Sequence, residues 1–198
     1  MTVRGDATER MPQLIAFDLD YTLWDFWVDT HVSPPFKRDG NSINQATDRY
    51  KTPISFYKDV PRILQHLVDS KCHIAACSRT SAQDEARQLL TLLLLPPSSE
   101  SNSSSPRRAI DYFDTLEIYP GSKLRHFKAL NKKTGIPYEE MLFFDDEHRN
   151  KEVESLGVTM QLVRDGMSWK VFQQGLELWR TRRGTEDKSE PAAAEDSG

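Results

Sequence analysis

Short apolar stretches alternate along this chain with segments in which apolar residues recur every three or four positions. The apolar stretches lie at 14–17, 73–78, 115–120, 141–144 and 158–163. Such stretches are typical of buried strands, and the periodic segments between them predict amphipathic helices. Strands that alternate with helices indicate an α/β domain, in which a parallel five-stranded sheet is covered by helices on both faces.

Individual residues mark the ends of several predicted helices. Pro61 suits the first turn of the helix after residue 60. Ser81, followed three residues later by Asp84, predicts a capping box for a helix that ends near Leu95. Gly135 is the residue type that closes a helix, here the one that precedes the fourth strand.

The ordered domain is expected to span residues 12–183 and to end in a helix that begins near Ser168. Residues 1–11 are predicted to form a disordered N-terminus. Residues 96–108, with the sequence PPSSESNSSSPRR, have no apolar side chain after the prolines and predict a flexible insertion. Residues 184–198 predict a disordered acidic tail.

The composition limits the possible classes of protein. The chain has 198 residues, 37% of them hydrophobic, and a formal net charge of −4, which favours one domain and argues against a nucleic-acid partner. Cys72 and Cys77 match neither a disulfide framework nor a zinc site, so both are expected as buried free thiols. No apolar run reaches the ~18 residues of a membrane span, and the N-terminus lacks a secretory signal. We therefore expect a cytoplasmic monomer away from membranes, with entry into the nucleus left open.

Polar residues follow the predicted strands at points that a parallel sheet would bring together. Asp18 and Asp20 follow the first strand, and residues two apart in a strand share a face, so they are expected side by side. Ser78 ends the second strand, and Asp145 and Asp146 end the fourth. Ligands of such sheets bind beyond the carboxyl ends of the strands, and we expect the site there.

The charges at this edge favour a divalent cation. Four carboxylates would gather there, whereas Arg79 and Lys123 return only two positive charges, and crowded carboxylates repel unless a cation compensates. Mg²⁺ takes hard oxygen ligands and works beside phosphate, whereas zinc prefers Cys or His. The histidines are scattered along the chain, and surface or packing roles are expected for them. The set therefore predicts a Mg²⁺ site for the transfer of a phosphoryl group.

Four motifs resemble those of the haloacid dehalogenase (HAD) superfamily of phosphohydrolases. That superfamily has D-x-D-x-T, then Ser or Thr after the second strand, then Lys, then an acidic pair. The stretches FDLDYTLWDFWVDTHVSPPF, CSRTS, IYPGSK and FFDDEHRN are similar, more narrowly, to its magnesium-dependent phosphatase family of acid phosphatases. The match covers roughly Met11 to Arg180 without the serine-rich insertion. It implies a Rossmann-like HAD fold with only a minimal cap insertion, and Mg²⁺ as cofactor.

The resemblance also implies catalytic roles. Asp18 would be the nucleophile that forms an aspartyl-phosphate, and Asp20 would protonate the leaving oxygen and then deprotonate the attacking water. The Ser78 hydroxyl, the Lys123 ammonium and the backbone N–H groups of Leu19 and Asp20 would surround the phosphoryl oxygens.

The metal ligands follow from the same resemblance. Asp18, the main-chain carbonyl of Asp20 and Asp146 would hold Mg²⁺. Asp145 is a further candidate ligand, or it would orient Lys123 or a metal-bound water.

The resemblance also bears on the residues that would contact substrate. Arg79, a planar multidentate donor, fits recognition of phosphate or substrate. Thr22 is expected to brace the first motif and Trp24 to lie in the core, whereas Trp27 is expected to face the substrate.

We therefore expect a magnesium-dependent phosphomonoester hydrolase that accepts aryl phosphates or phosphotyrosine in proteins. Small sugar phosphates, including amine-linked ones of the fructosamine-6-phosphate type, are the alternative substrates, and an inactive HAD-fold binding module is the non-enzymatic alternative. A response-regulator receiver has its acceptor Asp at the third strand, which here ends EIYPG without an Asp, and the second acidic pair of this chain follows the fourth strand instead. A dehalogenase would need neither Asp20 nor the metal. A phosphomutase needs a cap, but the segment from Leu23 to Asp59 is shorter than the ~40 residues of an independent fold. An open site without a lid domain is expected.

Overall fold

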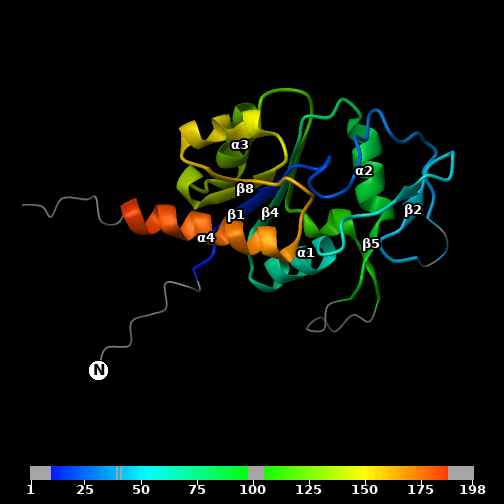
Figure 1. The fold of residues 1–198 in the computed structure, drawn as a ribbon, viewed down its shortest axis with the longest axis horizontal. Coiled ribbons are helices and arrows are strands. Elements are labelled where there is room, and N and C mark those ends of the chain that lie inside the picture. Colours follow the sequence, from blue (N-terminus) through cyan, green and yellow to red (C-terminus); the bar gives the residue numbers. More distant parts are fainter. Residues whose placement is uncertain (1–9, 39, 41, 98–104, 187–198) are drawn as a thin grey trace, which may run out of the picture.

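A five-stranded parallel sheet forms the centre of the computed structural model, which describes residues 10–38, 40, 42–97 and 105–186 (Figure 1). The strands of this sheet are β1 (Leu14–Phe17), β4 (His73–Ser78), β7 (Thr115–Ile118), β8 (Met141–Asp145) and β9 (Thr159–Leu162), and their spatial order is β7-β4-β1-β8-β9. All neighbours are parallel, and β1 lies centrally between β4 and β8. The α/β fold class and the five predicted strands are confirmed.

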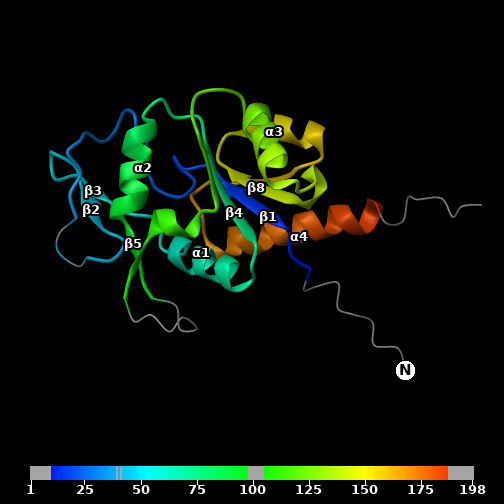
Figure 2. The same cartoon turned by 180° about the vertical axis from the view of Figure 1, so that it is seen from behind.

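Two layers of helices cover the sheet. The helices are α1 (Val60–Asp69), α2 (Gln83–Leu92), α3 (Lys123–Thr134) and α4 (Trp169–Glu186), with 3₁₀ helices η1 (Ala109–Tyr112), η2 (Tyr138–Glu140) and η3 (His148–Leu156). Figures 1 and 2 show α1 and α4 on one face of the sheet and α3 on the other. The strands therefore need apolar side chains on both faces, as their unbroken apolar sequences predicted.

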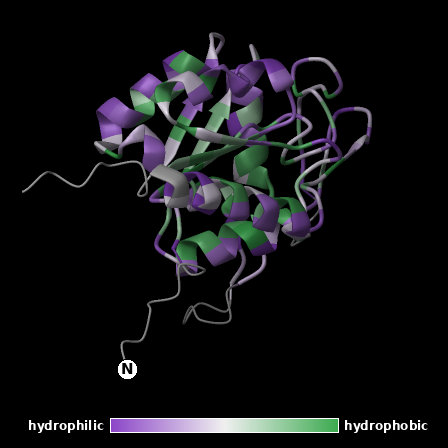
Figure 3. Cartoon of the chain, turned by 60° about the vertical axis from the view of Figure 1, so that its left-hand side comes forward, coloured by the Kyte–Doolittle hydropathy of each residue, from purple (hydrophilic) through white to green (hydrophobic). Residues whose placement is uncertain are grey.

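The core consists of two apolar clusters, one on each face of the sheet. Alternate residues of β1 go to different clusters, with Ile15 and Phe17 beside α1 and α4, and Leu14 and Ala16 beside α3. This alternation is the two-residue period of a strand. Figure 3 shows the same layering, because hydrophobic strands lie inside and hydrophilic residues lie on the outer faces of the helices.

The predicted helix ends are partly confirmed. Pro61 lies in the first turn of α1, and Gly135 follows α3 with φ of 72°, a left-handed conformation that glycine adopts without steric cost. The capping box at Ser81 is wrong. The N-cap residue of α2 is Ala82, and the Ser81 hydroxyl instead donates to Asp29 at 3.3 Å.

The segment between Leu23 and Asp59 forms a small flap rather than a lid domain. Its strands β2 (Ala46–Thr47) and β3 (Pro53–Ile54) have two residues each and pair antiparallel. Trp24 is fully buried and stacks on Phe26 and Phe56, which attach the flap to the main core. The minimal cap insertion and the core position of Trp24 are confirmed.

The described residues run from 10 to 186, a few positions past the expected domain limits of 12 and 183. The helix α2 ends at Leu92 instead of near Leu95, because Leu94 and Leu95 form the strand β5 (Leu94–Leu95). This strand pairs antiparallel with β6 (Arg107–Arg108), so the two ends of the expected 96–108 insertion lie close together. Residues 98–104 of that insertion, residues 1–9 and residues 187–198 lie outside the described residues. Arg10 is ion-paired with Glu140, and α4 runs three residues past Arg183.

Both cysteines are free and buried, as predicted. Cys72 donates its thiol to the carbonyl of Pro12 at 3.3 Å, and burial raises its pKa to about 12. Burial also raises the pKa of Cys77. Among the helices that the structure describes, none is both long enough and apolar enough to cross a membrane.

Candidate active site

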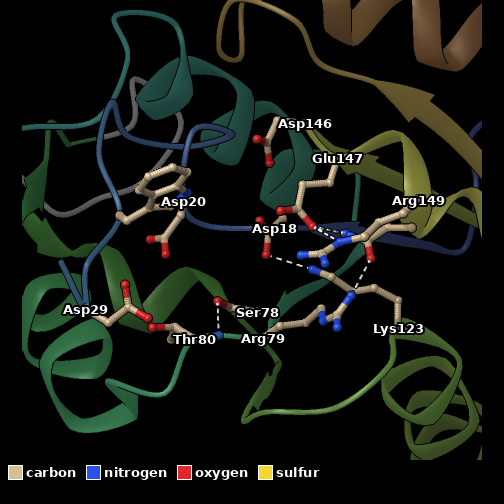
Figure 4. A pocket seen from close by; sticks show the side chains of 12 residues that line it. Asp18, Asp20, Asp29, Ser78, Arg79, Thr80, Lys123, Asp146, Glu147 and Arg149 are labelled. Atoms are coloured by element: carbon tan, nitrogen blue, oxygen red, sulfur yellow. Dashed lines mark hydrogen bonds and ion pairs between the residues drawn. The ribbon is translucent and has the colours of Figure 1, made fainter. Parts of the chain in front are cut away.

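Most of the predicted site residues line a cavity of about 220 Å³ at the carboxyl ends of β1, β4 and β8 (Figure 4). Leu19 and Asp145 are fully buried and do not line it. The cavity combines residues at or after the ends of these strands with one residue of α3 and with Trp27 and Asp29 from the first part of the flap. The lining residues are Asp18, Asp20, Trp27, Asp29, Ser78, Arg79, Thr80, Lys123, Asp146, Glu147, Arg149 and Asn150.

Lys123 lies at the centre of the buried charges. It is the first residue of α3 and only 1% exposed, and its ammonium donates to Asp18 at 2.7 Å and to the carbonyl of Cys77. The same ammonium lies 3.0 Å from Asp145. Burial lowers the pKa of Lys123, but the neighbouring groups, first of all the charges of Asp18 and Asp145, together raise it by more than burial lowers it. The side chain therefore stays charged.

Three carboxylates surround one possible cation position. One oxygen each from Asp18, Asp145 and Asp146 lies within 4.8 Å of the others. Burial raises the pKa of Asp18, and although Lys123 lowers it, Asp145 raises it again. The pKa of Asp146 is raised to about 6, mainly by burial and secondly by the charge of Asp145. A single ammonium therefore does not compensate three carboxylates, and a divalent cation with oxygen ligands fits both the charge and the donor set.

Asp145 is the most constrained of these carboxylates. It is fully buried, and besides Lys123 it accepts from the backbone N–H of Glu147 at 2.8 Å and from the side-chain amide of Asn150 at 2.9 Å. Its ion pair with Lys123 agrees with the predicted orienting role, while its place in the carboxylate cluster keeps it a candidate ligand.

Asp20 faces the cavity but lies apart from the carboxylate cluster. The strand β1 ends at Phe17, and the chain then turns, with Tyr21 at φ of 54°. Asp18 and Asp20 both line the cavity and lie close enough for the charge of Asp20 to act on Asp18, although a turn rather than a continued strand brings Asp20 there. The indole N–H of Trp24 donates to Asp20 at 2.8 Å, and burial raises the pKa of Asp20 to about 6.

The turn after β1 is fixed by backbone hydrogen bonds. The carbonyl of Leu19 accepts from the N–H groups of Thr22, Leu23 and Trp24. Thr22 braces this turn through its backbone, because its carbonyl accepts from Met167 N–H at 3.0 Å. Its buried hydroxyl has no hydrogen-bond partner among the described residues.

Ser78 and Arg79 enter the cavity from the end of β4. Ser78 is 1% exposed, and its hydroxyl oxygen accepts from the N–H of Thr80 at 3.3 Å. Arg79 is half-buried, and its guanidinium donates to the side-chain oxygen of Asn150 at 3.1 Å. Both residues therefore lie where they were predicted.

Trp27 lies at the rim of the cavity, and its predicted contact with substrate stays a prediction. It is 48% exposed, and its ring contacts Tyr21 edge-on at 5.3 Å and His31 at 5.1 Å between ring centroids. The backbone N–H of Trp27 donates to Nδ1 of His31 at 3.2 Å. His31 therefore supports the rim, rather than lying isolated on the surface.

Five lining residues were not predicted individually. Asp29, Thr80, Glu147, Arg149 and Asn150 lie outside the strand ends that guided the prediction. All five lie within the motifs that carry the resemblance, with Asp29 in the first motif, Thr80 in CSRTS and the other three in FFDDEHRN, so those motifs were the available signal. In Figure 4, Asp20 and Asp29 lie on one side of Asp18, whereas Lys123 and Arg149 lie on the other.

Comparison with known sequences places this geometry in a family. The sequence model of the acid phosphatase family matches residues 10–182. The human protein named magnesium-dependent phosphatase 1 is 46% identical over 171 residues, which are 86% of this chain and 88% of that protein. A HAD-like hydrolase superfamily protein of Schizosaccharomyces pombe is 47% identical over 148 residues, which are 75% of this chain and 83% of that protein.

Solved structures share the fold at much lower identity. The N-terminal part of a Bacteroides fragilis protein, which contains a phosphatase domain in complex with Mg, is 18% identical with a TM-score of 0.51, covering 88% of this chain and 40% of that chain. The 3-deoxy-D-manno-octulosonate 8-phosphate phosphatase of Yersinia pestis is 11% identical with a TM-score of 0.53, covering 91% and 86%. Taken with the family match and the two sequence relatives, the chain belongs to the acid phosphatase family of the HAD superfamily, as its motifs predicted.

Proposed function

We propose that this protein is a magnesium-dependent phosphomonoester hydrolase that works through a covalent phosphoryl-Asp18 intermediate. The observation that carries the proposal is the contact of Asp18 with Lys123 at 2.7 Å, in a cavity where Asp145 and Asp146 bring two further carboxylates close to Asp18. A nucleophile needs a fixed position and a site for developing negative charge, and this arrangement offers both.

Magnesium is the cofactor of choice for this donor set. Asp18, Asp146 and the main-chain carbonyl of Asp20 would hold it. Asp145 is a further candidate ligand. When bound, Mg²⁺ neutralises the carboxylates and the phosphoryl oxygens, and it thereby permits the approach of an anionic substrate. The names of the human relative and of the Bacteroides fragilis complex agree with this choice.

Asp18 and Asp20 divide the two chemical steps. A carboxylate oxygen of Asp18 attacks phosphorus while the bond from phosphorus to the leaving oxygen breaks, and the Asp20 carboxyl gives its proton to that oxygen. Water then attacks the phosphoryl-aspartate, Asp20 takes the proton from this water, and inorganic phosphate leaves as Asp18 is restored. The hydrogen bond from Trp24 to Asp20 at 2.8 Å supports this role, because it aims the carboxyl group.

The remaining donors would bind the phosphoryl oxygens. Ser78 and Lys123 are both 1% exposed and face the cavity from opposite elements, β4 and α3. With the backbone N–H groups of Leu19 and Asp20, they would surround the transferred group. Fixed donors of this kind supply most of the catalysis when the transition state is loose. Arg79 would bind the outer phosphate oxygens as a bidentate cation.

The rim supports aryl phosphates and phosphotyrosine as substrates. Trp27 presents an exposed aromatic face beside the cavity, held by Tyr21 and His31, and the flap adds no lid that would exclude a side chain on a protein. Aromatic rings stack favourably on such a surface. The second candidate is an amine-linked sugar phosphate, which the exposed carboxylate of Asp29 in the cavity wall favours, because it could pair with an ammonium group.

A phosphatase assay tests the proposal. The wild-type protein should hydrolyse p-nitrophenyl phosphate in the presence of Mg²⁺, and a chelator should stop this hydrolysis. Ca²⁺ should not restore the activity, because it prefers more ligands at longer distances. Asp18→Asn should abolish turnover while the protein remains folded. Turnover that survives the chelator or the Asp18→Asn change would reject the mechanism, and a wild-type protein without activity would leave the inactive binding module as the better description.

We also propose that the enzyme works as a monomer in the cytoplasm. The two buried free thiols support a reducing compartment. Size-exclusion chromatography with light scattering and fractionation of cells would test these two proposals.

A further inference from the structure

The end of the FFDDEHRN motif contributes a buried asparagine to which the proposed function gives no task. Asn150, in η3, is 1% exposed and lines the cavity. Its amide nitrogen donates to both oxygens of Asp145 at 2.9 Å, and its amide oxygen accepts from the guanidinium of Arg79 at 3.1 Å. One side chain therefore joins the carboxylate beneath Lys123 to the arginine of the cavity wall.

Chemistry allows only one orientation of this amide. A guanidinium has donors and no acceptor, so the amide oxygen must face Arg79, and an ionised carboxylate has acceptors only, so the amide nitrogen must face Asp145. The same nitrogen lies 3.4 Å from a carboxylate oxygen of Glu147. The side chain is thus locked by its partners, and a locked side chain can transmit position.

The contact with Arg79 orients the guanidinium without neutralising it. Among the described residues, no carboxylate forms an ion pair with Arg79, and the acceptor that holds it is the neutral amide of Asn150. A carboxylate in that place would hold Arg79 equally well but would cancel its charge. A neutral acceptor therefore suits an arginine that must bind a phosphate dianion.

The contact with Asp145 acts on the other side of the site. Asp145 lies 3.0 Å from the ammonium of Lys123, which in turn donates to Asp18 at 2.7 Å. Two hydrogen bonds from Asn150 hold the plane of the Asp145 carboxylate, and the direction in which it pulls Lys123 depends on that plane.

We propose that Asn150 is a positioning residue that aligns Arg79 for phosphate binding and Asp145 for support of Lys123. This inference rests on the proposed phosphatase function, because it assigns the residue by its effect on that reaction. It predicts that the two contacts are separable, since loss of the Arg79 contact weakens phosphate binding and loss of the Asp145 contact slows turnover.

The experiment compares Asn150→Ala, Arg79→Ala and the double variant with the wild-type enzyme in saturating Mg²⁺. The measurements are KM and kcat with p-nitrophenyl phosphate and, independently of turnover, the dissociation constant of inorganic phosphate by calorimetry. Asn131→Ala is the matched control, because Asn131 also donates its amide to a partner, the carbonyl of Ile136, but lies in α3 outside the cavity lining. Melting temperatures verify that each variant is folded.

Asn150→Ala is expected to lower kcat/KM by about 10- to 100-fold, the range for loss of a hydrogen bond to a charged group. Phosphate binding should weaken clearly more in the wild-type background than in the Arg79→Ala background, because the contact with Arg79 is already absent there and only the support of Lys123 through Asp145 is left to lose. The kcat loss should persist in both backgrounds. The control should leave KM, kcat and phosphate binding unchanged.

Asn150→Asp covers the case in which Asn150→Ala does not fold. This variant keeps the shape and an oxygen towards Arg79, but it brings a second charge against Asp145 and cancels that of Arg79. It should therefore weaken phosphate binding at least as much as Asn150→Ala, whereas a residue with a purely steric role would tolerate the change.

The inference is overturned if Asn150→Ala binds phosphate like the wild type, or if it weakens binding equally in the Arg79→Ala background. Phosphate binding by Asn150→Asp that matches the wild type would also overturn it. A wild-type enzyme that neither hydrolyses phosphomonoesters nor binds phosphate would instead reject the proposed function, and this inference with it.

Discussion

Replacement of Lys123 by methionine is expected to remove activity and to lower the free energy of unfolding, because the buried carboxylates lose their compensating charge. Methionine fills most of the space of the lysine stem but returns no charge. Asp18 and Asp145 would then lose the ammonium that lies 2.7 Å and 3.0 Å from them, in a site where Lys123 is 1% exposed. The carbonyl of Cys77 would lose its side-chain donor as well.

The size of the effect follows from the burial of this ion pair. Removal of one partner of a buried pair costs roughly 3–5 kcal/mol in the free energy of unfolding, because an uncompensated charge stays behind. For a domain of this size, each kcal/mol lowers the melting temperature by roughly 2–4 °C, so a fall of about 6–20 °C is expected without metal. Mg²⁺ should restore part of this loss, because it supplies positive charge to the same carboxylates and binds only the folded state.

The assay is urea or thermal unfolding of wild type and Lys123→Met, each with a chelator and with excess Mg²⁺. Lys128→Met is the matched control, because Lys128 lies in the same helix but is exposed, and its stability should change little. A Lys123→Met protein as stable as the wild type in chelator would refute the reasoning. A Mg²⁺-induced gain smaller than that of the wild type would show that the metal and Lys123 do not serve the same carboxylates.

Three further predictions concern the acid, the rim and the thiols. Asp20→Asn should slow the hydrolysis of alkyl phosphates far more than that of p-nitrophenyl phosphate, because a poor leaving group needs the proton; an equal loss across a leaving-group series would argue against the acid role. Trp27→Ala should raise KM for aryl phosphates by roughly 5-fold, as expected for an aromatic contact of ~1 kcal/mol, and should hardly change KM for small alkyl phosphates; equal changes would remove Trp27 from substrate binding. Burial raises the pKa of Cys72 to about 12 and also raises that of Cys77, so a thiol reagent near neutral pH should label neither cysteine rapidly before denaturation and both after it; rapid labelling of the native protein would contradict the buried assignment.

Much of the site could be predicted because strand ends are easy to locate in a sequence. The apolar runs fixed where β1, β4 and β8 end, and parallel topology then brought Asp18, Ser78 and Asp145 to one edge without any knowledge of side-chain contacts. The Lys123 ammonium reaches the same place from the first turn of α3, and the resemblance of the IYPGSK motif to the family predicted this.

The rest of the site depends on turns and 3₁₀ segments, which have no comparable periodicity. Asp20 lies in the turn that follows β1, and the hydrogen bonds to the Leu19 carbonyl that hold this turn cannot be read from a strand pattern. Asn150 lies in η3, a segment in which residue spacing does not predict which side chain faces inward. Asp29 belongs to the irregular first part of the flap, so no strand or helix pattern could place it in the cavity wall.

The position of Lys123 shows that the architecture serves chemistry at the expense of local stability. A cation in the first turn of a helix faces the positive end of the helix dipole, and burial adds a desolvation cost. Asp18 and Asp145 offset both effects, yet those carboxylates are themselves buried and repel each other. A fold optimised for stability alone would have apolar side chains in place of Lys123, Asp18 and Asp145. Such replacements of buried ion pairs are often neutral or stabilising. The burial of these three charges is explained once phosphate and a metal ion are taken as the partners for which this edge of the sheet is arranged.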